Sequence, residues 1–204
     1  MNRVSKLIIF AVVAAAQLAA PAWMIGQREY ILRNGTVYKF RTAPVDPYDA
    51  FRGRYVWLNF EENTATWPGP GPIPDVLIRG DKWVYAALTI GPDGFAKFTN
   101  ATFDPPASGD YLRAHTSYFW NSTSPTAAPD RVLIILPFDR YYMNEKAAPE
   151  AERVYREHSN VKTRDAYATV RIWKGNAVLE GLYVADQRIE DFLANAPESP
   201  ATER

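Results

Sequence analysis

Two short polar segments combine acids, arginines and tyrosines, which are residue types suited to peptide binding or to acid–base chemistry. The first, PVDPYDAFRGRYVWLNF, covers residues 44–60, and the second, FDRYYMNEK, covers 138–146. An arginine beside tyrosines can hold a carboxylate or stack on a ring, which suits recognition of an extended peptide. The candidate binding residues are therefore Asp46, Asp49, Arg52, Arg54, Tyr55, Arg140, Tyr142 and Glu145.

The first segment permits a structural and a functional interpretation. Asp46 and Asp49 can accept hydrogen bonds from nearby backbone N–H groups in Asx-turns, and Arg52 and Arg54 follow closely enough to pair with them. Gly53 allows a backbone approach that a side chain would block. Such a charged turn either fixes where the next strand begins or binds a partner, and both interpretations remain open.

We expect the two segments to converge, because each flanks a predicted core strand and strand ends far apart in sequence are often neighbours in a β domain. This predicts Asp46 or Asp49 within ion-pair reach of Arg140, or Arg52 within reach of Glu145. An exposed pair of this kind contributes under about 1 kcal/mol, whereas breaking one side of a buried pair costs roughly 3–5 kcal/mol.

Catalytic constellations are poorly supported by the residue types present. A strand after an Asp-Pro-rich turn resembles membrane-anchored signal peptidases, which implies a Ser–Lys dyad, but the sequence has no Ser-Met-x-Pro segment. The carboxylates Asp46, Asp49 and Glu145 can serve as an acid–base pair, as in glycan cleavage. We therefore expect a non-enzymatic binding module, with a carboxylate-based hydrolase or a degenerate signal-peptidase-like domain as the alternative.

Composition limits the possible partners. The 204 residues suit one ordinary domain or two very small ones, and 23 basic residues balance 23 acidic ones. Nucleic-acid binders usually present a basic face, so we expect no nucleic-acid partner. The absence of cysteine and the presence of only two histidines argue against a zinc site, and we expect neither a metal nor another cofactor.

The first residues are expected to target the chain to a membrane. Residues 7–25, LIIFAVVAAAQLAAPAWMI, contain no charge and as a helix would extend about 28 Å, enough for a bilayer core. Arg3 and Lys6 predict that the amino terminus is cytoplasmic, which places the chain in the inner membrane with a periplasmic carboxy-terminal domain. The alternative is a signal peptide cleaved after Ala22; Trp23 at the end of the apolar run favours a retained anchor.

These features predict an anchor or signal peptide at 1–25, a periplasmic domain at 26–195 and a disordered tail at 196–204. The part outside the membrane has 23 acids and 21 bases, a net charge of −2 once Arg3 and Lys6 are set aside. That value implies no strong attraction to anionic lipid headgroups. The membrane, through the helix, and another envelope protein or peptide are thus the expected partners.

The outer domain is expected to be mainly β: an antiparallel sandwich or barrel-like domain with two short helices, preceded by one N-terminal transmembrane helix. Hairpin patterns occur at 82–98 and 166–184, and their shared Tyr-Ala sequences indicate either two related halves or convergent hairpins. The other predicted elements are a hairpin at 29–40 turning at Asn34-Gly35, strands at 54–60 and 132–136, a proline-rich loop at 67–75, and helices at 149–158 and 187–194.

The sequence GRYVWLNF at 53–60 resembles the motif Gly-Asp-Tyr-x-x-Leu-x-Tyr of the bacterial GDYXXLXY family. Gly53, Tyr55 and Leu58 match the motif, while Arg54 replaces its Asp and Phe60 its final Tyr. The segments PVDPYDAFRG, FDRYYMNE and AYATVRIWKGNAVLEGLYV strengthen the resemblance, which extends over most of the chain. It implies a membrane-anchored architecture and an envelope location, and it implies no reaction.

Overall fold

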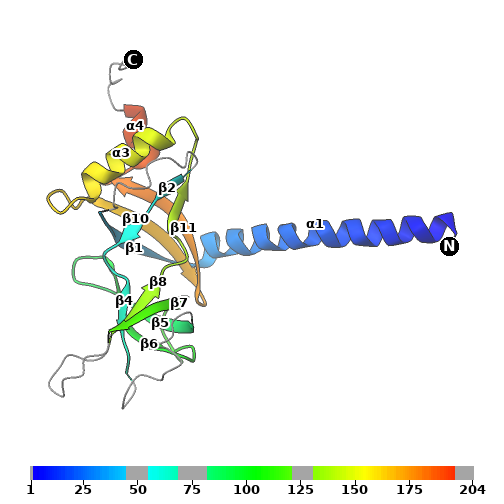
Figure 1. The fold of residues 1–204 in the computed structure, drawn as a ribbon, viewed down its shortest axis with the longest axis horizontal. Coiled ribbons are helices and arrows are strands. Elements are labelled where there is room, and N and C mark those ends of the chain that lie inside the picture. Colours follow the sequence, from blue (N-terminus) through cyan, green and yellow to red (C-terminus); the bar gives the residue numbers. More distant parts are fainter. Residues whose placement is uncertain (1, 45–54, 69–81, 121–130, 196–204) are drawn as a thin grey trace.

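A computed structural model describes residues 2–44, 55–68, 82–120 and 131–195 of the chain. Within these ranges the fold is a β-rich domain from which one long helix projects (Figure 1). The helices are α1 (Arg3–Asn34), α3 (Ala148–Ser159) and α4 (Ile189–Asn195). The strands are β1 (Thr36–Ala43), β2 (Tyr55–Trp57), β3 (Asn59–Phe60), β4 (Thr64–Thr66), β5 (Trp83–Ile90), β6 (Ala96–Thr102), β7 (Tyr111–Trp120), β8 (Arg131–Ile135), β9 (Arg140–Tyr142), β10 (Ala166–Trp173), β11 (Asn176–Val184) and β12 (Gln187–Arg188).

The described strands form three hydrogen-bonded groups. A five-stranded sheet has the order β12-β11-β10-β1-β3, a small closed barrel has the order β4-β6-β5-β7-β8, and β2 pairs with β9 in a two-stranded ribbon. Almost all pairings are antiparallel; β4 and β6 are parallel. The predicted fold class, mainly antiparallel β with short helices behind an apolar N-terminal helix, is confirmed.

One aromatic cluster connects the sheet to the barrel. The ring of Phe40 on β1 lies 6.0 Å from Phe60, 6.0 Å from Phe98 of the barrel strand β6, and 5.1 Å from Phe138 ahead of β9. Phe40 is completely buried, and side chains from both β units continue the same core. Because aromatic side chains bury large areas, this cluster holds the two units against each other.

The helix α1 continues nine residues past the predicted span, so the predicted hairpin at 29–40 is wrong. Asn34 ends the helix with its side-chain amide donating to the Tyr30 carbonyl, and the Gly35 N–H bonds the Ile31 carbonyl at 2.8 Å. An Asn-Gly pair is as suitable for a helix C-terminus as for a tight turn. Here Ile31 is buried against the domain, and this packing favours the helix.

The other two predicted hairpins are confirmed. The strands β5 and β6 pair around the turn at Gly91–Gly94, and β10 and β11 pair around Lys174-Gly175. Lys174 and Gly175 have φ values of 46° and 81°, which are the left-handed conformations that a two-residue hairpin turn requires. Whether these hairpins arose by duplication stays a prediction.

The predicted strand at 54–60 changes partner along its length. Burial alternates from Tyr55 to Phe60 as expected, but β2 pairs with β9 whereas β3 pairs with β1. Between them, the Leu58 N–H bonds the Asp139 carbonyl at 2.8 Å. This short segment therefore connects the ribbon to the five-stranded sheet.

The predicted helix at 149–158 is present as α3, which packs against β10 and β11 of the five-stranded sheet (Figure 1). Its buried residues recur at helical spacing on one face: Ala148, Ala151, Val154, Tyr155 and Ser159. The last helix begins two residues later than predicted. Gln187 and Arg188 pair with the end of β11, so α4 starts at Ile189. Asp186 has a φ of 61° in the preceding turn and accepts a hydrogen bond from Tyr167 instead of capping α4.

Candidate functional site

The β2–β9 ribbon brings three of the predicted site residues together. Tyr55 lies opposite Tyr142, with ring centroids 5.6 Å apart, and Trp57 lies opposite Arg140. The Arg140 guanidinium lies 5.5 Å from the Tyr55 ring and 5.0 Å from the Trp57 ring. The Tyr142 side chain is 67% exposed. These four residues form an exposed aromatic and cationic surface, which we call the ribbon face.

The remaining predicted site residues are placed less completely. Asp46, Asp49, Arg52 and Arg54 lie outside the described residues, so their expected pairings with Arg140 and Glu145 stay predictions. Glu145 is exposed in the turn that follows β9.

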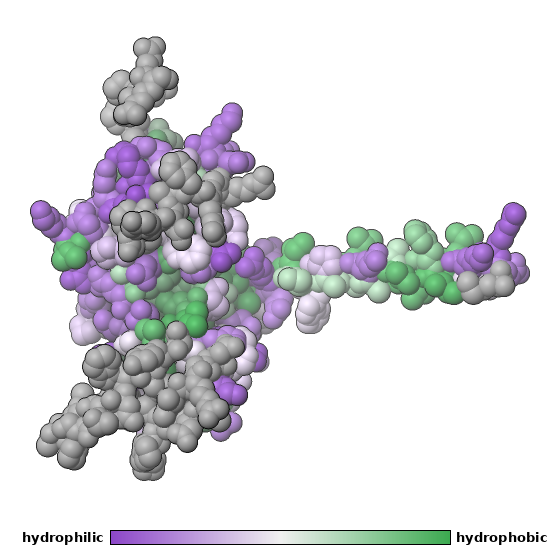
Figure 2. Space-filling view, in the orientation of Figure 1, coloured by the Kyte–Doolittle hydropathy of each residue, from purple (hydrophilic) through white to green (hydrophobic). Residues whose placement is uncertain are grey.

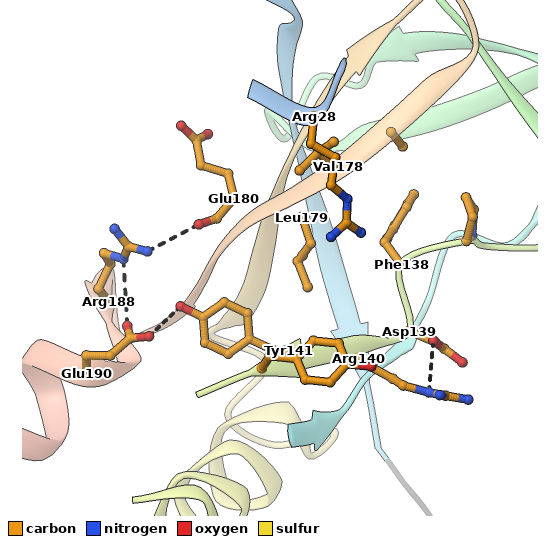
Figure 3. A pocket seen from close by; sticks show the side chains of 13 residues that line it. Arg28, Phe138, Asp139, Arg140, Tyr141, Val178, Leu179, Glu180, Arg188 and Glu190 are labelled. Carbon is orange, nitrogen blue, oxygen red and sulfur yellow. Dashed lines mark hydrogen bonds and ion pairs between the residues drawn. The ribbon is translucent and has the colours of Figure 1, made fainter. Parts of the chain in front are cut away.

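A cleft of about 580 Å³ opens beside the ribbon, between β9 and β11 (Figure 3). Its apolar wall comes from Phe138, Val178 and Leu179, and Figure 3 shows the Arg28 side chain of α1 directed between Phe138 and Leu179. A cleft of this volume is in the range that binds small ligands or short peptide segments. Its lining residues are Arg28, Pro137, Phe138, Asp139, Arg140, Tyr141, Tyr142, Ala177, Val178, Leu179, Glu180, Arg188 and Glu190.

The edge of β11 faces this cleft with backbone groups that have no strand partner in the part of the chain that the structure describes. The two-residue turn between β10 and β11 is closed by a hydrogen-bonded pair, Trp173 with Asn176. Bonded and non-bonded pairs alternate from there, so Ala177 and Leu179 belong to non-bonded pairs. The N–H and C=O groups of Ala177 and Leu179 therefore point away from β10. The strand β12 covers this edge only at Tyr183 and Val184.

The edge of β9 presents backbone groups in the same manner. The Leu58 N–H bonds the Asp139 carbonyl, so these two residues form a hydrogen-bonded pair. Since bonded and non-bonded pairs alternate along an antiparallel ladder, the next bonded pair is Val56 with Tyr141, and the backbone groups of Tyr141 point toward β2. The backbone groups of Arg140 and Tyr142 then point away from β2. Two strand edges thus border one cleft, an arrangement that can accept a further extended chain.

Charges at the cleft are mostly paired. Arg188 lies 3.7 Å from Glu190 and donates to the Glu180 carbonyl at 3.2 Å. The Tyr141 hydroxyl donates to Glu190, and burial together with that carboxylate raises the pKa of Tyr141. Arg140 has Asp139 at 3.6 Å.

Arg28 differs from the other two arginines of the cleft. The structure gives it no ion pair with another described residue, although its side chain is directed into the cleft. Its guanidinium is therefore the cation that is available to an incoming carboxylate.

Sequence reasoning missed Arg28, Arg188, Glu190 and the edge of β11. The signal for Arg28 was a cation within one turn of the apolar span's end, just before the predicted hairpin at 29–40. The β11 edge had a weaker signal, the two-residue turn at Lys174-Gly175. This turn fixes which residues of β11 direct their backbone groups away from β10, but only the sheet order shows that this edge is open.

A second cleft, of about 500 Å³, is lined by an ion-pair network. Arg164 lies 2.7 Å from Glu61, and Arg41 lies 3.9 Å from Glu61 and 3.8 Å from Asp93. Arg41 also lies over the Phe95 ring at 3.8 Å. These cations already have partners, so the network connects β1, the β5–β6 turn and the residues before β10. Among the described residues no group of three His, Asp or Glu side chains is arranged to hold a metal ion.

The structure thus defines a class of protein: a β-rich domain with two open strand edges at a cleft, joined to one apolar helix long enough to cross a membrane. The chain belongs to the GDYXXLXY family, whose model matches residues 17–182 under the description GDYXXLXY protein. Neither the comparison with curated proteins nor the comparison with solved structures found a match.

The family motif has a structural explanation in the described residues. Val56, Leu58 and Phe60 point into the core with exposed fractions of 4% or less, while Tyr55 belongs to the ribbon face. The apolar residues of the motif therefore attach the β2–β9 ribbon to the core, and its tyrosine, Tyr55, belongs to the ribbon face.

Proposed function

We propose that this protein is a non-enzymatic, membrane-anchored module that binds an extended segment of another envelope protein in the cleft between β9 and β11. The observation that carries the proposal is the β11 edge, whose backbone groups at Ala177 and Leu179 border the cleft without a strand partner among the described residues. Strand addition at such an edge gives affinity through main-chain hydrogen bonds, and side-chain pockets give specificity.

The side chains around the edge suit a peptide with a carboxylate. Phe138 and Leu179 offer an apolar wall, and Arg28 offers a guanidinium that has no ion-pair partner within the described ranges. The adjoining ribbon face adds Trp57 and Tyr142, aromatic residues of the kind enriched at protein interfaces. We propose that the peptide pairs with β11 and continues toward the ribbon face.

The helix and its flanking charges support a location for the domain. The helix α1 acts as a membrane anchor or a signal sequence, and Arg3 and Lys6 precede its apolar part. The excess of basic residues on the cytoplasmic side of membrane spans supports a cytoplasmic amino terminus. We therefore propose that the β domain lies in the periplasm, attached to the inner membrane.

A carboxylate-based hydrolase is the alternative function. The cleft acids Asp139, Glu180 and Glu190 each lie within 4 Å of an arginine. Each of these carboxylates is therefore already held by an arginine, which suits a role in positioning and binding. A screen of peptides and glycans distinguishes the two functions, since turnover abolished by Glu190→Gln or Glu145→Gln would establish the hydrolase.

The direct test of strand addition removes the backbone N–H of Ala177, which points away from β10. In Ala177→Pro the ladder to β10 is kept, because the lost N–H points into the cleft, whereas Val178→Pro removes an N–H that bonds Arg171. Binding of the full chain in nanodiscs to an array of extended peptides is then measured for each variant. We expect Ala177→Pro to remain folded and to lose binding by about tenfold or more, since each lost hydrogen bond contributes about 1 kcal/mol and the ring adds a clash.

The control is Val178→Pro, which should lower the melting temperature. Peptide binding that Ala177→Pro leaves unchanged would exclude strand addition at β11. An array without any binder would exclude the peptide-binding function itself.

A further inference from the structure

Two adjoining clefts lie where α1 enters the domain. One, of about 500 Å³, is lined mainly by apolar surface from Trp23, Tyr30 and Trp173, and the other, of about 270 Å³, lies next to it. They share Gln27, Ile31 and Asn176. We call this combined hollow the root site.

The root site is basic although the outer domain as a whole is nearly neutral. Arg28, Arg113 and Lys174 line it, and none of the described residues that line it carries a carboxylate side chain. Arg28 thus borders both the cleft between β9 and β11 and the root site. None of the three cations has an ion pair with another described residue. The net charge of the outer domain implied no strong attraction to anionic lipid headgroups, but a net charge does not reveal a local cluster of cations such as this one.

Aromatic rings surround these cations. Arg113 lies 4.3 Å from the Trp83 ring, and Lys174 lies 5.6 Å from the Trp173 ring. Trp173 in turn packs edge-on against Tyr30 of α1 at 5.9 Å. Tryptophan and tyrosine favour the interface between bilayer and water, because their rings are apolar and carry one polar group.

The position along α1 fixes the depth of the root site. Ala22 and Trp23, near the end of the apolar span, line the same hollow as Lys174 and Asn176 at the tip of the β10–β11 hairpin. The space-filling view shows α1 becoming green, apolar surface as it leaves the domain (Figure 2). When the span occupies the bilayer core, the hairpin tip is therefore at headgroup level.

We infer that the root site binds the headgroup of an anionic phospholipid from the bilayer in which α1 is inserted. Arg113 and Lys174 contact the lipid phosphate, Arg28 adds a third positive charge at the border with the cleft between β9 and β11, and Trp23 and Trp173 lie along the glycerol and upper acyl region. Arginine suits phosphate because its planar donors match the phosphate oxygens. This inference depends on the membrane anchoring in the proposed function and not on peptide binding.

The test uses the absence of cysteine in the chain, which allows one label per variant. An environment-sensitive fluorophore is attached at Asn176→Cys, which lines the root site without removing a cation, and at Val161→Cys, which is 77% exposed after α3. Full-length protein is placed in nanodiscs of phosphatidylcholine that contain a small share of spin-labelled phosphatidylglycerol or spin-labelled phosphatidylcholine. Fluorescence quenching by each labelled lipid is then compared.

We expect strong quenching at Asn176 and little at Val161, with phosphatidylglycerol preferred over phosphatidylcholine. Arg28→Gln should lower that preference by about fivefold, given the typical contribution of one basic residue near an anionic surface. Lys174→Gln is the second variant and should lower it similarly. Equal quenching by the two lipids, or equal quenching at the two positions, would refute the root site. Peptide binding that remains sensitive to Ala177→Pro would show that the proposed function stands independently.

Discussion

Tyr155 shows how one residue connects a helix to two strands. Its hydroxyl accepts from the Asn59 N–H at 3.3 Å and donates toward the carbonyls of Ala43 and Asn59 at 3.4 and 3.5 Å. The side chain is completely buried, and burial raises the pKa of Tyr155 to about 12. The folded state therefore holds the phenolic proton more tightly than the unfolded chain does.

This shift predicts a loss of stability at alkaline pH. The contribution is fully present below pH 10, the ordinary pKa of tyrosine, and is lost as the pH rises from about 10 to about 12. A shift of this size corresponds to about 2–3 kcal/mol in the free energy of unfolding. Tyr155→Phe should reduce stability at neutral pH by about 1 kcal/mol and should flatten the alkaline decline. Denaturant unfolding of the full chain in detergent at several pH values measures both effects; an equally steep decline in the variant would contradict this assignment.

At the scale of single residues, the sequence indicated Tyr55, Arg140 and Tyr142 but not the arginine that enters the cleft. Tyr55, Arg140 and Tyr142 lie in aromatic-rich segments that can be recognised in the sequence, and the pairing of β2 with β9 brings them together. Arg28 was missed because its position at the cleft depends on α1 continuing beyond the apolar segment. The packing of Ile31 and Tyr30 against the domain decides this continuation, and no local sequence pattern reports it.

The connection between α1 and β1 is the element that fixes the direction of the apolar helix relative to the β domain. A Cβ at Gly35 would lie 2.6 Å from the Ile31 carbonyl oxygen and about 3.1–3.2 Å from the backbone of Ile172. All three atoms belong to backbone and cannot rotate away. This close approach explains a glycine at a position where φ is an ordinary −73°.

We therefore expect Gly35→Ala to destabilise the protein by about 1–3 kcal/mol, the usual cost of overpacking. The matched control is Gly26→Ala in the same helix, where a Cβ would meet nothing within 4 Å. Because alanine is the better helix former, that variant should be neutral or slightly stabilising. Thermal unfolding of both variants in detergent provides the comparison, and equal melting temperatures would contradict the described junction.

The hairpins were predictable at the element scale because their turns have local chemical signals. Gly91–Gly94 and Lys174-Gly175 each separate two runs of strand-forming residues. The cleft had no such signal, since it forms between the edges of β9 and β11, which belong to different sheets. Sheet order depends on long-range packing, and for this reason the candidate site was only partly predictable from sequence.

At the scale of the whole molecule, the apolar helix projects from one side of the domain (Figure 1). The cleft between β9 and β11 and the root site are both lined by residues of α1 close to the domain. Both sites include Arg28 or its neighbours on α1. A partner bound in the cleft would therefore lie close to the bilayer surface.

The membrane topology gives a separate prediction. Arg3 and Lys6 precede the apolar segment, so the domain should be outside the cytoplasm. A reporter that fluoresces only in the cytoplasm should stay dark when it is fused after Arg204. A bright fusion would reverse the orientation, and a shortened mature chain would show that the segment is a cleaved signal peptide.

The most direct test of the peptide-binding cleft is site-specific photo-crosslinking of the full chain in native membranes. A photoreactive amino acid replaces Tyr142, which is exposed beside the cleft, and Val161 serves as the exposed control position. We predict a light-dependent adduct with an envelope protein at position 142 that disappears when Ala177→Pro is added, with none at 161. An adduct that survives Ala177→Pro, equal adducts at both positions, or no adduct at 142 would contradict binding at the β11 edge.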